Sequence, residues 1–190
     1  MLRRSRGAGA APWLLLVPIF FATPSVLGQL STPCAGDRTL EDQEDVERLA
    51  SHLASSGCTT IGGLQIRHDV NDLLPLRNLT EIEYLSLWDV KHLRSLDGLE
   101  GLHSISGKIQ IGSAPELTSL RGLRHVKGPL YGSLYMKDVP SLQTLEGLHG
   151  ITEVEFIYLQ ELQRLESLDG LRGLSYISWH VEDHTRNSIS

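Results

Sequence analysis

The sequence predicts a β-solenoid, namely a right-handed β-helix of the leucine-rich-repeat kind, with an N-terminal capping helix pinned by a disulfide. Three observations support this prediction. A leucine motif recurs about every 24 residues, a short run of alternating apolar and polar residues precedes each copy, and Cys34 and Cys58 flank an amphipathic segment. Repetition at a period of roughly 20–50 residues is typical of folds whose units bury their apolar faces against one another.

The repeated motif has the form L-x-x-L-x-G-L-x-x-[LVI]. Its four copies begin at Leu93, Leu117, Leu142 and Leu165, with spacings of 24, 25 and 23 residues. One unit cannot bury its own leucines, so the same inward positions are filled again at every repeat. The motif glycines are expected to give positive φ or room for a close backbone approach. These glycines are Gly98, Gly122, Gly147 and Gly170. The motif therefore indicates shape and not a catalytic site.

Six short runs of period two are the expected strands. They are Leu64–Ile66, Leu85–Leu87, Ile109–Ile111, Leu134–Met136, Ile157–Leu159 and Ile177–Trp179. A leucine-rich-repeat horseshoe usually places asparagine just after the strand, and this chain does not. The corresponding residues are Val90, Ala114, Val139 and Leu162. We therefore expect coils closed by apolar packing, as in a flattened β-helix.

The segment from Thr39 to Ser56 is predicted to be a helix. Thr39 can cap its first turn together with Asp42, and acidic residues crowd the positive end of the helix dipole. Gly57 supplies the stop. One apolar stripe follows helical spacing. It consists of Val46, Leu49, Ala50, Leu53 and Ala54.

The first residues have the three parts of a secretory signal peptide: a basic start, an apolar run and small residues before the expected mature start at Gln29. The apolar run, from Ala11 to Ala22, is too short for a membrane span of about 20 residues. The predicted segments are a signal peptide (1–28), an N-terminal cap (29–58), a repeat domain (59–180) and a polar tail (181–190). We expect a secreted chain without membrane insertion, in which export favours a Cys34–Cys58 disulfide.

The charge balance excludes several function classes. Removal of the three arginines of residues 1–28 takes the formal charge from −6 to −9. Nucleic acids and anionic membranes require a basic footprint, which this chain does not have. Two cysteines without clustered histidines are also a weak basis for a zinc site.

At this point the residues show a resemblance to a family. The cysteine-bounded helix, the stretch "GCTTIGGLQI" and units of the form strand, "xxPxL", "xxLxGLxxI" resemble the receptor L domain, over residues 34 to 180. That family includes the ligand-binding lobes of the epidermal-growth-factor and insulin receptors and related cell-wall proteins. The resemblance implies the repeat fold and ligand contact through the sheet surface. The chain lacks the cysteines that usually close the far end of such a domain.

Strand alternation predicts an aromatic face. If the leucines and isoleucines of the strands point inward, their neighbours point outward. The outward residues proposed for ligand binding are Tyr84, Trp88, Lys108, Tyr135, Lys137, Phe156, Tyr158 and Tyr176. Large amphipathic side chains on a rigid sheet suit protein recognition. The alternative is a cross-strand ladder that stiffens the sheet.

The sequence contains no nucleophile-elbow, zinc-protease or phosphate-loop motif. His103, His125 and His149 occupy different positions relative to the repeat leucines and are not expected to form a ligand row. Asp97, Glu146 and Asp169 share one repeat position, which Arg121 occupies in the second unit. A solvated row in which the arginine pairs with its neighbours is favoured there over a calcium ladder or a carboxylate dyad. No enzyme, metal or cofactor is expected.

Asn78 begins an Asn-Leu-Thr sequon and is a candidate glycosylation site. The leading functional hypothesis is a secreted, non-enzymatic module that binds an extracellular protein or peptide. The alternatives are a structural or glycan-binding matrix or cell-wall component, and a fragment of a larger cell-surface receptor.

Overall fold

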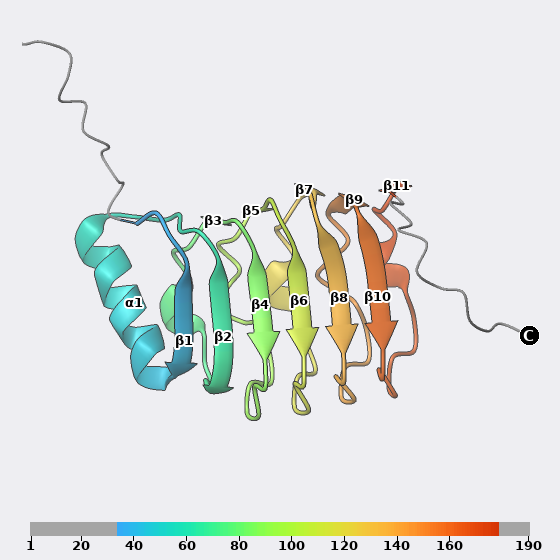
Figure 1. Cartoon of the computed structure of the whole chain (residues 1–190), viewed down its shortest axis with the longest axis horizontal. Coiled ribbons are helices and arrows are strands. Elements are labelled where there is room, and N and C mark those ends of the chain that lie inside the picture. Colours follow the sequence, from blue (N-terminus) through green and yellow to red (C-terminus); the bar gives the residue numbers. More distant parts are fainter. Residues whose placement is uncertain (1–33, 179–190) are drawn as a thin grey trace, which may run out of the picture. The chain divides into compact units, whose positions relative to one another are not determined.

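The computed structural model describes residues 34–178, and its main feature is a six-stranded sheet in which each strand runs parallel to its neighbours. Figure 1 shows these strands side by side in chain order. They are β1 (Arg38–Asp42), β2 (Leu64–Asp69), β4 (Leu85–Trp88), β6 (Ile109–Gly112), β8 (Ser133–Lys137) and β10 (Phe156–Gln160). The predicted signal peptide and polar tail lie outside the described residues.

Two smaller parallel sheets are formed by segments that follow the strands β2, β4, β6, β8 and β10 in the chain. One pairs β3 (Glu81–Ile82) with β5 (Ser104–Ile105). The other contains β7 (Gly128–Pro129), β9 (Ile151–Val154) and β11 (Tyr176–Ile177), with β9 in the middle. Three short 3-10 helices complete the connections. They are η1 (Leu74–Leu76), η2 (Arg121–Leu123) and η3 (Asp169–Leu171).

The prediction of a closed solenoid is wrong. The described residues form three separate open sheets and one helix, which is a mostly parallel α/β-like arrangement and not a sheet curled into a right-handed β-helix. The short strands pair in two groups, β3 with β5 and β7 with β9 and β11, so their hydrogen-bond ladder is interrupted. The leucine-rich segments bend through 3-10 turns, and no continuous strand encloses the core of residues 34–178.

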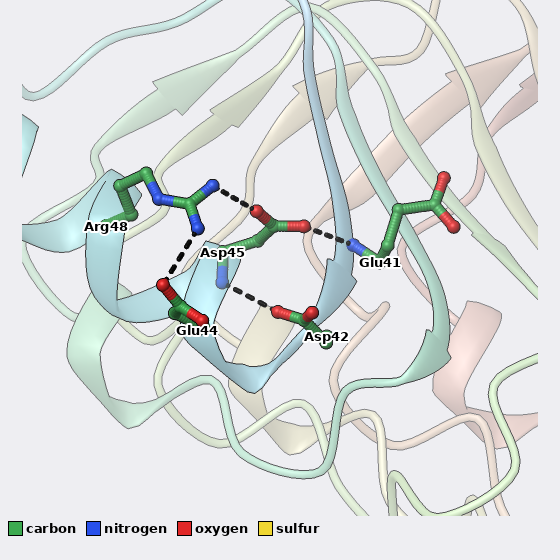
Figure 2. Close-up of polar contacts among 5 residues, drawn as sticks. All are labelled: Glu41, Asp42, Glu44, Asp45 and Arg48. Atoms are coloured by element: carbon green, nitrogen blue, oxygen red, sulfur yellow. Dashed lines mark hydrogen bonds and ion pairs between the residues drawn. The ribbon is translucent and has the colours of Figure 1, made fainter.

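The helix α1 (Gln43–Ser56) begins four residues later than predicted, because residues 39–42 belong to β1. Asp42, and not Thr39, is the N-cap, and its carboxylate accepts a hydrogen bond of 3.0 Å from the backbone N–H of Asp45. The Asp45 carboxylate in turn accepts one of 3.0 Å from the N–H of Glu41, as Figure 2 shows. Arg48 bridges Asp45 and Glu44 one turn on. A side-chain oxygen therefore caps the helix as predicted, but it belongs to Asp42, three residues after Thr39.

The helix stops where the sequence indicated. Gly57 takes the left-handed conformation, with φ of 70°, and donates its N–H to the carbonyl of Leu53. Cys34 and Cys58 form a disulfide, which confirms the predicted pairing. Three residues of the apolar stripe, Val46, Leu49 and Leu53, are buried in the core cluster.

The core is built by register. The inward residues Leu64, Leu85, Ile109 and Leu134 stand opposite one another on adjacent strands, and all are fully buried. Because the period of a strand is two, the same register places the polar and aromatic neighbours of these residues on the opposite face. This opposite face of β2, β4, β6, β8 and β10 is called the sheet face below.

The motif glycines behave in both of the expected ways. Gly98 has φ of 103°, a conformation that L residues rarely adopt. Gly122 does not have positive φ, but a Cβ placed on it would lie 1.8 Å from the carbonyl oxygen of Leu96 in the preceding unit. At Gly122 the repeat therefore requires glycine for close backbone approach.

Candidate functional site

The sheet face carries a stack of aromatic rings, here called the aromatic ladder, made of Trp88, Tyr135 and Tyr158. The Tyr135 and Tyr158 rings lie opposite one another on β8 and β10, with centroids 4.7 Å apart and planes 5° from parallel. The Trp88 ring is 5.7 Å from that of Tyr135 and tilted by 36°. Aromatic pairs of this kind contribute about 0.5–1.5 kcal/mol beyond the area they bury. The ladder contacts therefore stabilise the three rings against one another.

A glycine makes the ladder possible. Trp88 is on β4 and Tyr135 on β8, and β6 lies between them with Gly112 as the residue opposite Trp88. A Cβ on Gly112 would lie 2.3 Å from Cζ3 of Trp88. The indole therefore occupies the space that a side chain at position 112 would fill, and in this way it reaches across β6 to Tyr135.

A second cluster surrounds Tyr84. Its ring lies over Gly63, where an added Cβ would be 2.0 Å from the ring, and Nζ of Lys108 is 5.5 Å from the ring centroid. The Tyr84 hydroxyl donates a hydrogen bond of 2.6 Å to Asp37 and accepts one of 2.9 Å from Nε2 of Gln65. The cluster therefore joins the segment just before β1 to β2 and to the residue before β4.

The electrostatics of this cluster follow from its hydrogen bonds. The hydroxyl of Tyr84 and the backbone N–H of Gly63, at 2.7 Å, both donate to the Asp37 carboxylate and hold its pKa below the usual 3.8. The same hydrogen bond to Asp37 raises the pKa of Tyr84 above its usual 10.0, because ionised Tyr84 would lose this bond and place a phenolate next to a carboxylate. Tyr84 therefore stays a neutral donor over the ordinary range of pH.

Seven of the eight residues proposed for ligand binding lie on or beside the sheet face. Lys108 comes just before β6, and its carbonyl accepts from the N–H of Leu85. Lys137 stands opposite Gly112 on β8. Phe156 begins β10 and is 53% exposed, whereas Tyr84, Trp88 and Tyr135 are half-buried by the contacts described above.

The placement of Tyr176 on this face is wrong. Tyr176 belongs to β11, which pairs with β9 in the three-stranded sheet, and its side chain is 59% exposed. The sequence predicts the run from Ile177 as the sixth strand, whereas the sixth strand of the main sheet is β1 at the opposite edge. Each repeat contains a short strand after its leucine turn as well as a long one, and residues 176–177 correspond to the short one.

The structure adds three residues to those predicted from the sequence. Asp37 and Gln65 fix Tyr84, and Gly112 accommodates Trp88. Alternation alone could have assigned Gln65 to the sheet face, because it lies between Leu64 and Ile66. No sequence signal marks Asp37, since the segment from Thr39 is predicted to be a helix.

The remaining polar candidates are placed as follows. Arg121 bonds Glu146 at 2.8 Å, which confirms that the arginine pairs with a neighbouring acid of its row. The rings of His103 and His125 stack with centroids 6.2 Å apart. Within residues 34–178 no group of three or more His, Cys, Asp or Glu is placed to hold a metal ion. Asn78 is exposed and lies two residues after η1.

None of the helices between residues 34 and 178 has the length and apolar character needed to cross a membrane. Comparison of the chain with protein-family models, with curated proteins and with solved structures finds no match. The functional argument therefore depends on the geometry of the sheet face.

Proposed function

We propose that this chain is a secreted, non-enzymatic binding protein whose sheet face recognises an extracellular protein or peptide. The observation that carries the proposal is the aromatic ladder of Trp88, Tyr135 and Tyr158 on a rigid parallel sheet. Its rings already pack against one another, so a ligand would have less to order on binding. Tyr and Trp held in this way are the residue types that dominate protein interfaces.

The direction of the rings favours a protein over a glycan. Tyr135 lies between Trp88 and Tyr158 and stacks nearly parallel to Tyr158, so its ring faces are occupied inside the ladder. Sugars bind aromatic residues by stacking on ring faces, and the faces of the central ring, Tyr135, are not available for this. The hydroxyls of Tyr84 and Tyr158 bond Asp37 and Gln160, so the face offers mainly ring edges, with Lys108 and Lys137 on or beside it. This combination of apolar edges, donors and positive charge suits a protein or peptide with acidic and apolar side chains.

The resemblance of the repeat motifs to receptor L domains also supports ligand binding. The signal-like N-terminus and the Cys34–Cys58 disulfide support secretion, because disulfides persist in oxidising compartments. Both arguments concern the chain as a ligand-binding module outside the cell, and neither selects the ligand.

The test is a binding screen with the secreted chain against an array of extracellular proteins, with a glycan array in parallel. The double variant Trp88→Ala/Tyr135→Ala removes the ladder, and the control Tyr131→Ala/Tyr176→Ala removes two exposed aromatic side chains that lie off the sheet face. We expect protein partners whose binding is lost in the first variant and kept in the control. Equal binding by both variants would refute the assignment of the face, and binding to glycans alone would refute the ligand class.

A further inference from the structure

The two edges of the six-stranded sheet differ in how well their apolar interior is covered. Beside β1, Leu40 is buried against the apolar stripe of α1. At β10 the inward residues Ile157 and Leu159 are only partly buried, and so is most of the leucine segment that follows. That segment contributes Leu162, Leu165, Leu171 and Leu174 as partly buried residues and Leu168 as an exposed one. Within residues 34–178 no element lies beyond β10 in the sheet order.

Exposed apolar side chains are concentrated at this edge. Six large apolar side chains among the described residues are exposed, and four of them lie between residues 156 and 177. These four are Phe156, Tyr158, Leu168 and Tyr176. Among the strands of residues 34–178, β10 pairs with β8 alone, which leaves a row of its backbone N–H and C=O groups on the other side to pair with another strand.

The aromatic ladder ends at the same edge. One face of the Tyr158 ring stacks on Tyr135, and within residues 34–178 no ring contacts the other. Tyr158 is also the middle residue of β10, with Phe156 and Ile157 on one side and Leu159 and Gln160 on the other. The strand is therefore symmetrical in its inward and outward pattern about the residue at which the ladder stops.

We propose that the β10 edge binds a second copy of this chain through antiparallel pairing of the two β10 strands, with the two-fold axis at Tyr158. In this register Tyr158 stands opposite Tyr158 of the second copy, Ile157 opposite its Leu159, and Phe156 opposite its Gln160. Opposite residues of an antiparallel pair point to the same side of the sheet, so inward residues meet inward residues. An isologous contact requires such self-complementarity.

The pairing explains three features of the edge together. The two Tyr158 rings extend the ladder across the axis, the two apolar interiors cover one another, and the free backbone groups of both strands are paired. The sheet face of each copy stays accessible, so the inference does not depend on the proposed ligand binding and is measured without a ligand. One contact is adverse, because Glu155, which precedes β10, lies opposite Glu161 of the second copy.

The register is tested by thiol cross-linking of the full chain. Tyr158→Cys places the introduced thiols of the two copies directly opposite one another, within the range of a disulfide. The control Phe156→Cys lies on the same face of the same strand, but its two thiols are four residues apart along the paired strands, or about 13 Å. We expect a covalent dimer on a non-reducing gel for Tyr158→Cys only. Cross-linking of both variants, or of neither, would refute the register.

Sedimentation equilibrium over a range of protein concentrations tests the association itself. The wild-type chain is expected to dimerise, and Tyr158→Lys, which opposes two ammonium groups at the axis, is expected to weaken the dimer by roughly 100-fold or more. Glu155→Lys replaces the adverse pair by an attractive one and should tighten it. The matched control Tyr131→Lys, at a loop position 73% exposed, should change nothing.

A wild-type chain that stays monomeric would overturn the proposal, because the edge would then be covered by another segment or partner. Dimerisation that Tyr158→Lys does not weaken would overturn it as well, since the contact would lie on another surface. Loss of ligand binding in the ladder variants has no bearing on this result, so the two proposals can fail separately.

Discussion

Replacement of Gly112 by alanine should displace Trp88 and leave the fold intact. The backbone of Gly112 does not have positive φ, so alanine can adopt it, and glycine to alanine in a strand gains about 0.5–1 kcal/mol from the unfolded chain. The added methyl would lie 2.3 Å from Cζ3 of Trp88, where ordinary contacts are 3.4 Å or more, so the ring must move by more than 1 Å. That movement sacrifices the contact with Tyr135, which is worth about 0.5–1.5 kcal/mol.

The net change in the free energy of unfolding is therefore close to zero, and the melting temperature should stay within about 3 °C of the wild type. Ligand binding through the sheet face should nevertheless fall, because the ladder is broken. Near-ultraviolet circular dichroism reports the position of the indole, and the spectrum of Trp88→Phe supplies its contribution. In a Trp88→Ala background the same Gly112→Ala change meets no ring, and there it should be neutral or stabilising.

Gly122→Ala adds the same methyl group and serves as the contrast. There the methyl meets the Leu96 carbonyl at 1.8 Å, and backbone cannot swing aside as a side chain can. Forced separation of the two units should cost about 3 kcal/mol, at the upper end of overpacking, and lower the melting temperature by about 6–12 °C. The claim that both glycines leave no room for a Cβ would be refuted by either of two results. One is a melting temperature of Gly122→Ala equal to that of the wild type, and the other is an unchanged indole spectrum in Gly112→Ala.

Three further changes test the polar and covalent contacts. Asp37→Asn should destabilise the chain near neutral pH. Because the folded-state pKa of Asp37 is lowered by Tyr84, the stability that the carboxylate adds is present above the usual 3.8 and lost as pH falls through the lowered value, so urea titrations of variant and wild type should converge in acid. A difference that persists unchanged in acid would contradict this. Replacement of Cys34 and Cys58 by serine opens a loop with a sequence separation of 24. It should lower the free energy of unfolding by about 3 kcal/mol, seen as a lower midpoint in urea. An unchanged midpoint would contradict the entropic contribution of the disulfide. Asn78→Gln should abolish a glycan-dependent shift in gel mobility in a eukaryotic secretory host, and a wild-type chain without such a shift would show that the exposed sequon is not used.

Much of the local structure could be predicted because it depends on nearby residues. The alternation of Leu85, Ser86 and Leu87 places the two leucines inward wherever the strand pairs. The helix and its stop at Gly57 follow from short-range signals as well, and the Cys34–Cys58 pairing follows because the sequence has two cysteines and export favours their pairing. The start of the helix was missed by a few residues because Thr39 and Asp42 both have capping side chains, and pairing of residues 38–42 with β2 decided between them.

The candidate site could be predicted only in part. The sequence indicates that Trp88, Tyr135 and Tyr158 point to the same side, but not that Trp88 leans across Gly112 to reach Tyr135, since that depends on which strand lies between them. For Tyr176 the sequence predicts the wrong sheet. Its local pattern is that of a strand, and only pairing with β9 reveals that it lies in another sheet.

The leucine repeat and its alternation were enough to identify the residues that form the core, because burial in a strand follows a period of two that any short window contains. Tertiary structure alone decided that the strands form three open sheets and not a closed solenoid. It also brought Asp37 to Tyr84, 47 positions apart in sequence, and aligned Tyr158 with Tyr135. Sheet membership and register are set by hydrogen bonds between distant segments, whose partners no local pattern specifies.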